Sequence, residues 1–318
     1  MVNRENPLEK LLDRHLPKAQ NREFLGFLDA VMLDAVDKST QAFGRCWSTV
    51  PSTLVGQVPL ILYRHVFEMA DAVHALLLES ASVPARLQLR SCFEALVYLE
   101  FMLREDKEVR VLAFVASSYA WGLRYARRLE EGSGERNVFL KETRTGDIRG
   151  DHPFAQVSVP RETVRKYEEC LESEPVRTGY DLLKRFKKEK KRWPRIWCEV
   201  VNEDLRSLRD LALYLDRGAE YVMYDLWSRS VHPDLLSVHF LNPGVGRPQR
   251  LRKVRDGEKI GSTAIAAVRL LRDATVLVLA DTRPGEVGAF EKAWENEVTS
   301  RLNEIGEEIT IFDETSGS

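Results

Sequence analysis

The sequence is poor in cysteine and has no long apolar runs. Its four cysteines, Cys46, Cys92, Cys170 and Cys198, are far apart, and none forms a C-x-x-C pair. A disulfide framework or a zinc site is therefore not expected, and a reducing cytosol fits best. Charged residues interrupt the apolar runs well short of the roughly 18 residues that a membrane span needs. The amino terminus lacks the apolar segment of a secretory signal, so we expect a cytoplasmic protein without membrane contact.

The common catalytic and nucleotide-binding motifs are also missing. The chain has no G-x-x-x-x-G-K-[ST], no H-E-x-x-H and no G-x-S-x-G sequence. Gly244 and Gly246 lie in a proline-rich loop, so they are not a dinucleotide fingerprint. His65, Glu68, Asp71 and His74 recur at every third residue. On one helix such spacing turns His65 and His74 to opposite faces, so we expect no metal site and no cofactor.

The net charge is small, but it is unevenly distributed. The 318 residues are 44% hydrophobic and 30% charged, with a formal net charge of -2, which is typical of a globular protein. Residues 184–195 contain eight basic residues and one acid, a local charge of +7 that leaves -9 on the rest. One basic patch on an acidic body excludes a protein that binds nucleic acid over its whole surface.

Apolar residues recur with helical spacing along most of the chain, and no β–α alternation is present. We therefore predict an all-α fold, a multi-helix bundle with peripheral helices. Residues 251–260, with Asp256–Gly257 in the middle, are compatible with one small β-hairpin. The expected helices span residues 8–15, 22–43, 58–80, 82–103, 109–130, 162–171, 180–191, 204–215, 219–231, 264–279 and 290–305.

Shifts in composition suggest three regions. Residues 1–55 form an amino-terminal helical region, and residues 56–283 form the helical core. The core contains a basic insertion at 131–197, where glycines, prolines and charged residues become frequent. Residues 284–318 are expected to form a carboxy-terminal helix and a disordered tail.

The segment from Tyr221 to Pro233 has an unusual polar face. At 3.6 residues per turn, Tyr221, Tyr224, Ser228 and His232 lie on one side of a helix. Pro233 disfavours helical geometry at the residue before it, which places His232 at the helix C-terminus. The helix dipole alone can explain a histidine there. Alternatively, Ser228 and Tyr224 orient the imidazole for general acid–base chemistry near neutral pH.

Arg90 and Glu94 are one helical turn apart in the most apolar helix of the chain, which suits an ion pair within that helix. One interpretation is a structural pair that orients the bundle. The other is that both side chains face His232 and form one site with it.

The basic run is the best candidate for a nucleic-acid contact. Lys187, Lys188, Lys191 and Arg192 can neutralise phosphates, and Trp193 or Trp197 can stack on an unpaired base. A solvated helix face is the alternative, with the tryptophans serving as core anchors.

The order of these features resembles a family of mostly bacterial, all-helical proteins of unknown function. Its signature is Arg-x-x-x-Glu in a central apolar helix, a tryptophan after a lysine-rich run, and Tyr-x-x-x-Ser-x-x-Val-His-Pro. These elements correspond to Arg90 and Glu94, to Trp193, and to the segment 224–233. That family in turn is similar to the HEPN superfamily of helical bundles, many of which are metal-independent ribonucleases of toxin–antitoxin and phage-defence systems.

The resemblance implies a function and a set of site residues. His232 would be the counterpart of the HEPN histidine, in a protein that often acts as a dimer. The HEPN motif separates its arginine and histidine by four to six residues, whereas two residues separate Arg229 from His232. Either Arg90 or Arg229 then replaces the missing arginine, or nuclease activity has been lost in this branch.

We therefore expect a HEPN-like RNA-binding protein or endoribonuclease, with RNA, a second copy and an antitoxin or defence protein as its partners. The expected catalytic set is Arg90, Glu94, Tyr224, Ser228 and His232. A non-catalytic interaction module or a nucleotide sensor is the alternative.

Overall fold

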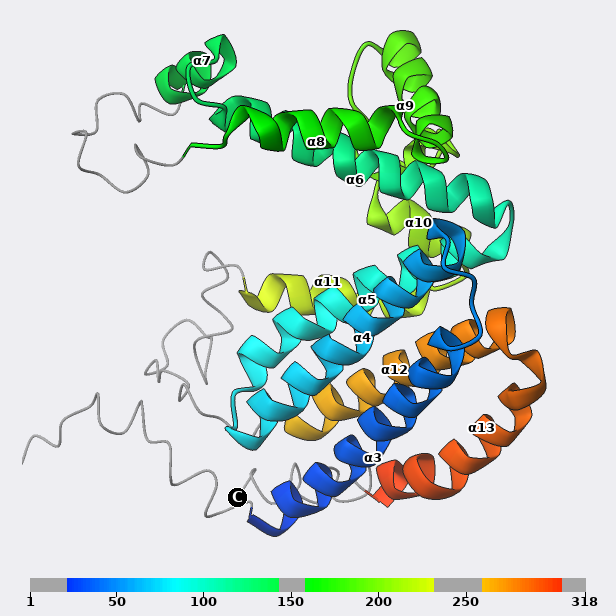
Figure 1. Cartoon of the computed structure of the whole chain (residues 1–318). Coiled ribbons are helices and arrows are strands. Elements are labelled where there is room, and N and C mark those ends of the chain that lie inside the picture. The colour runs from blue at the N-terminus through cyan, green and yellow to red at the C-terminus, as the bar shows by residue number, and fades with distance from the viewer. Residues whose placement is uncertain (1–21, 143–157, 232–258, 305–318) are drawn as a thin grey trace, which may run out of the picture. The chain divides into compact units, whose positions relative to one another are not determined.

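The computed structural model describes residues 22–142, 158–231 and 259–304, and these residues are almost entirely helical (Figure 1). Within these ranges the predicted all-α class is confirmed. An isolated β-bridge joins the described residues Glu130 and Val159. The hairpin expected at 251–260, the first helix at 8–15 and the disordered tail lie largely or wholly outside the described residues.

The chain divides into two compact units. Unit 1 consists of Met1–Arg104 and Ala212–Ser318, and unit 2 consists of Glu105–Leu211. Unit 2 is thus a single continuous segment inserted into the sequence of unit 1. The predicted basic insertion at 131–197 lies inside unit 2, and the three-region division of the chain stays a prediction.

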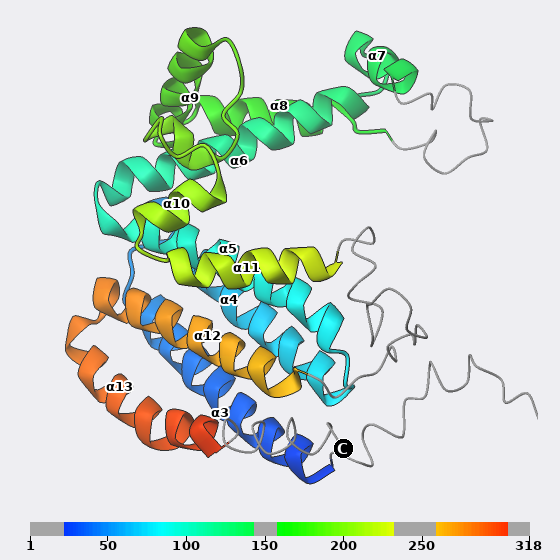
Figure 2. The same cartoon turned by 180° about the vertical axis from the view of Figure 1, so that it is seen from behind.

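Unit 1 is a bundle of four long helices, α3 (Arg22–Trp47), α4 (Leu54–Leu78), α5 (Ser82–Arg104) and α12 (Ile260–Thr282). Figures 1 and 2 show α3, α4, α5 and α12 side by side. A further helix, α11 (Gly218–Val231), packs on α5, and α13 (Val287–Trp294) packs on α12.

Helix α5 contacts three neighbouring helices, α4, α11 and α12. This central position follows from its sequence, because apolar residues cover most of its circumference. The fully buried side chains Leu89, Phe93, Leu96 and Leu99 all belong to it. Each can contribute roughly 1.5–3 kcal/mol by leaving water, so the burial of α5 is a major term in the stability of unit 1.

Helix α4 begins earlier than its apolar pattern predicts. Gly56 suggests a connection, but α4 starts at Leu54 and the Thr53 hydroxyl caps it by accepting from the Gly56 N–H at 3.2 Å. A Cβ at position 56 would lie 2.6 Å from the Pro51 carbonyl oxygen. Glycine is present there because the chain passes close by, and the connection between α3 and α4 is limited to residues 48–53.

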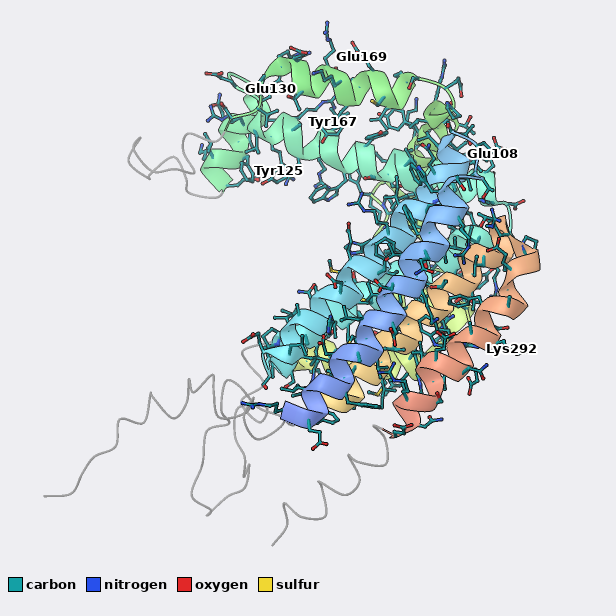
Figure 3. All side chains as sticks on the ribbon, turned by 60° about the horizontal axis from the view of Figure 1, so that its bottom comes forward. Glu108, Tyr125, Glu130, Tyr167, Glu169 and Lys292 are labelled. Carbon is teal, nitrogen blue, oxygen red and sulfur yellow. The ribbon has the colours of Figure 1, made fainter. Side chains whose placement is uncertain are left out.

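Unit 2 contains α6 (Lys107–Leu129), α7 (Gly134–Glu142), α8 (Arg161–Glu172), α9 (Val176–Lys190) and the 3₁₀ helix η3 (Trp197–Val200). Helix α6 is its backbone and packs against both α8 and α9. In Figure 3, Tyr167 lies between α8 and α6. Its ring occupies the space that a side chain at Gly122 of α6 would need, so Gly122 permits this close packing.

The helix expected at 204–215 is shorter, and α10 spans Leu208–Tyr214. The Ser207 hydroxyl accepts from the Asp210 N–H at 3.1 Å and fixes this later start. After α10, Asp216 adopts positive φ (61°), and Gly218 is the first residue of α11. Aspartate is one of the residues that tolerate this left-handed conformation.

Helix α13 starts at Val287, directly after a short 3₁₀ turn at Pro284–Glu286. A π-helical stretch at Glu295–Thr299 follows it. Among the described helices, none is long and apolar enough to cross a membrane.

Candidate functional site

Arg90 and Glu94 of α5 meet Tyr224 of α11. The Arg90 Nε donates to Glu94 Oε1 and to the Tyr224 hydroxyl, both at 3.0 Å. The same hydroxyl donates to Glu94 Oε1 at 2.7 Å. The structure thus brings together three of the five predicted catalytic residues from segments that are 130 residues apart in sequence.

The surroundings of these groups differ in exposure. The Tyr224 ring is buried against Phe93, with centroids 5.4 Å apart, and stacks on Tyr221. In contrast, the Arg90 and Glu94 side chains are 35% and 36% exposed. The cluster therefore has a buried phenol at its base and a charged pair at its solvent edge.

Burial and the Glu94 carboxylate raise the pKa of Tyr224 above its ordinary value. The phenol therefore stays protonated near neutral pH and acts as a hydrogen-bond donor to Glu94, not as a proton acceptor. Burial lowers the pKa of Arg90, but its hydrogen bonds to Glu94 and Tyr224 together raise the pKa by more than burial lowers it, so the net shift is upward. The guanidinium is a fixed positive charge.

The terminal nitrogens of Arg90 form no hydrogen bond with a described residue. Both of its hydrogen bonds to described residues use Nε, so Nη1 and Nη2 have no partner in the described part of the chain. A guanidinium can bind a carboxylate or phosphate through two parallel N–H groups. Arg90 is thus held in place by one nitrogen and presents two others.

Ser228 and His232 complete the predicted polar face of α11. The Ser228 hydroxyl is enclosed and has no hydrogen-bond partner among the described residues. His232 lies outside the described residues, so its distance to Arg90 and Glu94 stays a prediction. Arg229, the alternative arginine, is 62% exposed and forms an ion pair with Asp225 at 2.8 Å.

Three of the four residues with metal-like spacing on α4 contact different partners. His65 Nε2 is 2.9 Å from the Ser91 hydroxyl, and His74 Nε2 is 2.7 Å from Asp29. Glu68 pairs with Arg64 at 2.7 Å. As the helical geometry predicts, the two histidines contact different helices.

In unit 2 the basic run spans the end of α9 and the loop that follows. Lys187 and Lys188 lie on the last turn of the helix, and Lys191 ends it with a positive φ of 53°. All three side chains are exposed. None of them forms an ion pair with a described residue, whereas Lys190 pairs with Glu203.

Trp193 is neither fully exposed nor a core residue. The Lys187 Nζ lies 4.7 Å from the centre of its ring, and the Arg124 Cζ from α6 lies 5.9 Å away. Cations are attracted to the face of an indole ring. Trp197 is the buried anchor, since it is 8% exposed and packs edge-on against Phe114. Each tryptophan therefore fits one of the two interpretations of the run.

Arg192 has a structural contact that the sequence did not suggest. Its Nη1 and Nη2 donate to the buried Glu199 carboxylate at 3.0 and 2.5 Å. The Arg195 backbone N–H donates to the same carboxylate at 2.7 Å. Glu199 thus fixes both ends of the loop that carries Trp193, and Arg192 is largely committed to it.

This arrangement predicts a pH dependence. The hydrogen bond from Arg192 lowers the pKa of Glu199, against the opposing effect of burial. A carboxyl group with a lowered pKa in the folded state stabilises that state above its unfolded pKa and loses this contribution as the pH falls through the folded value. We therefore expect the melting temperature of unit 2 to fall as the pH drops below the ordinary range of a glutamate carboxyl group. Glu199→Gln should be less stable at neutral pH and should show a shallower acid decline.

Melting curves of the two forms at several pH values test this expectation. Glu189→Gln is the matched control, because Glu189 is an exposed carboxylate on α9 in the same basic run. An unchanged acid decline in Glu199→Gln, equal to that of the control, would contradict the assigned role.

A pocket of about 360 Å³ lies beside this loop in unit 2. Among its lining residues are Phe114, Trp121 and Arg124 of α6 and Trp193 and Trp197. Trp121, Arg124 and Tyr125 were not identified from the sequence. Their signal was present, because Trp121 and Tyr125 are large aromatic residues one turn apart on a helix face that is otherwise polar.

Fold and site together define an all-helical protein with a tyrosine–arginine–glutamate cluster in one unit and a basic, aromatic pocket in the other. The family model described as "Family of unknown function (DUF5677)" matches residues 57–244, which is more than half of the chain. The chain belongs to this family. No curated protein and no solved structure matches it.

Proposed function

We propose that this protein is a HEPN-like RNA-binding protein that cleaves RNA without a metal ion. The observation that carries the proposal is the Arg90 cluster: a guanidinium held through Nε, one-third exposed, with both terminal nitrogens open among the described residues. This is the geometry that binds a phosphate through two hydrogen bonds.

The roles of the other residues follow from this placement. Glu94 and Tyr224 position Arg90 and fix its charge. In cleavage, His232 transfers a proton while Arg90 stabilises the charge that develops on the phosphate, and Ser228 is the residue expected to orient the imidazole. Arg90 is a better candidate for the HEPN arginine than Arg229, because Arg90 is held by both Glu94 and Tyr224, whereas Arg229 is 62% exposed and its ion pair is with Asp225 of its own helix.

The basic run supports RNA as the ligand. Lys187, Lys188 and Lys191 are exposed and form no ion pair with a described residue, and each neutralised phosphate adds to affinity and to its salt dependence. Trp193 and Arg192 shape the same surface. A cytoplasmic toxin or phage-defence nuclease would work as a homodimer and with an antitoxin or defence-system partner, as the HEPN resemblance implies.

The test is RNA cleavage in EDTA by the wild type, His232→Ala and Arg90→Ala. General acid–base catalysis contributes about 100- to 10,000-fold, so His232→Ala should reduce the rate by that order. Arg64→Ala is the matched control, because Arg64 forms the same i,i+4 pair with Glu68 on an exposed face of α4. Equal cleavage by wild type and His232→Ala, or none by either, would end the nuclease proposal.

A second candidate is a non-catalytic module or nucleotide sensor, in which the same cluster fixes α11 on α5. It is favoured by the burial of Tyr224 and its hydrogen bond to Glu94. In this case Glu94→Ala lowers the melting temperature without loss of any chemistry. A nucleotide that binds the native state at Arg90 would raise the melting temperature of the wild type and not that of Arg90→Ala.

A further inference from the structure

We infer that unit 2 carries a separate binding site for an unpaired nucleobase of single-stranded RNA, in the pocket lined by Trp121, Arg124 and Trp193. This inference rests on the proposal that RNA is the ligand, but it uses no residue of the Arg90 cluster. In this site Trp193 does not stack on a base, and its ring instead makes cation–π contacts with Arg124 and Lys187.

The pocket has the size and lining of a small-ligand site. Its volume of about 360 Å³ is within the usual range, and Phe114, Trp121, Trp193 and Trp197 supply aromatic walls. Glu199 holds the loop that forms one wall, and Phe114 and Trp197 pack edge-on 5.3 Å apart. Ser117 also lines it, and its hydroxyl has no hydrogen-bond partner among the described residues.

Trp121 is the stacking platform. Its side chain lines the pocket and is nevertheless 68% exposed, the highest value among the large hydrophobic residues described. Tyr125, 51% exposed, stacks on it with ring centres 5.8 Å apart and planes 6° from parallel. In Figure 3, Tyr125 projects from the side of α6 that faces away from α8. A base added to this pair extends an existing stack, and base–aromatic stacking tolerates any sequence.

The charges around the pocket match a phosphate. Arg124, Lys187 and Arg195 form no ion pair with any described residue, and two of them lie over the Trp193 ring. A smaller neighbouring pocket of about 260 Å³ shares Arg124 and Trp193 with the first and is lined by Lys187 as well. Glu135 is the one acid among the described residues that line the two pockets. An anion with a flat aromatic part is the ligand that matches both the aromatic lining and the positive charges.

The experiment measures binding of a fluorescent single-stranded RNA 12-mer by anisotropy at fixed salt, with a matched oligomer that contains abasic positions. Because one stacked base contributes about 1–3 kcal/mol, Trp121→Ala should weaken binding of the native oligomer by about five- to 150-fold. The abasic oligomer should bind the wild type weakly and should not distinguish the variant. Trp47→Ala is the matched control, since Trp47 is an exposed tryptophan stacked on Phe43 in α3.

Arg124→Gln should weaken both oligomers and reduce the salt slope by about one ion. Equal affinities of Trp121→Ala and Trp47→Ala, or of native and abasic RNA, would overturn the base site and leave RNA binding at the basic run standing. The two proposals can also fail separately in the other direction. If Trp121→Ala loses RNA affinity but the wild type does not cleave RNA in EDTA, the base site is supported and the nuclease proposal ends. Binding of AMP to the wild type is measured by tryptophan fluorescence. The inference is overturned if the wild type binds neither the oligomer nor AMP.

Discussion

Replacing Arg217 with alanine is expected to destabilise unit 1 by about 3–5 kcal/mol, because it removes one partner of a largely buried ion cluster. Arg217 lies in the turn before α11 and is 13% exposed. Its Nε donates to Glu100 of α5, which is buried to the same extent, and its Nη1 donates to Asp273 of α12 at 2.9 Å. Without the guanidinium, the Glu100 carboxylate would be left in a poorly solvated site without its partner.

Chemical denaturation of the full chain measures this loss. Arg229→Ala is the control on the adjoining helix, since its ion pair with Asp225 is exposed and should cost less than about 1 kcal/mol. The double variant Arg217→Met, Glu100→Gln should recover part of the loss, because it removes the unpaired charge as well. A single variant as stable as Arg229→Ala would contradict the cluster.

This ion cluster matters for the candidate site because it fixes the start of α11. Tyr224 is two turns after Arg217, and its contact with Arg90 depends on how α11 lies on α5. Burial lowers the pKa of Arg217, but Glu100 and Asp273 together raise the pKa by more than burial lowers it. The net shift is upward, so the charge is permanent. Arg217→Ala should therefore loosen the Arg90 cluster without touching it directly.

The sequence predicted most of unit 1 because its signals are local. Helical spacing of apolar residues identified α3, α5 and α12 to within a few residues, and it did the same for α6 in unit 2. The pairing of Arg90 with Glu94 was also predictable, since one helical turn determines it. Tyr224 was identified only by its place in a polar face. That it meets Arg90 depends on the packing of α11 against α5, which no local pattern encodes.

The pocket of unit 2 was not predictable for the same reason. The basic run drew attention to residues 187–193, but its aromatic partner surface comes from α6, more than 60 residues earlier. Glu199 is one acid in a basic region, and its role depends on a loop conformation that is visible only in three dimensions. Gly56 suggested a connection and Gly179 gave no signal at all, yet both mark places where two segments touch.

Gly179 gives the second large prediction. It lies in α9 at the crossing with α6, where a Cβ would stand 2.1 Å from the Leu112 carbonyl oxygen and 2.9 Å from the Ala113 nitrogen. These are backbone atoms of a helix and cannot rotate away, so Gly179→Ala must move α9 from α6. Overpacking typically costs 1–3 kcal/mol, and the rigid neighbour places this site at about 3 kcal/mol or more.

Substitution of Gly26 by alanine should change the free energy of unfolding in the opposite direction. Gly26 is exposed in α3, and no atom lies within 4 Å of the place that a Cβ would occupy, so alanine there should stabilise the protein by about 1 kcal/mol through helix propensity alone. Denaturation curves and limited proteolysis distinguish the two. Because α6 and α9 contribute residues to both pockets of unit 2, Gly179→Ala should also weaken binding of single-stranded RNA, while Gly26→Ala retains it. Equal stability of the two variants would mean that α6 and α9 do not cross at Gly179, and the pocket between them would lose its structural basis.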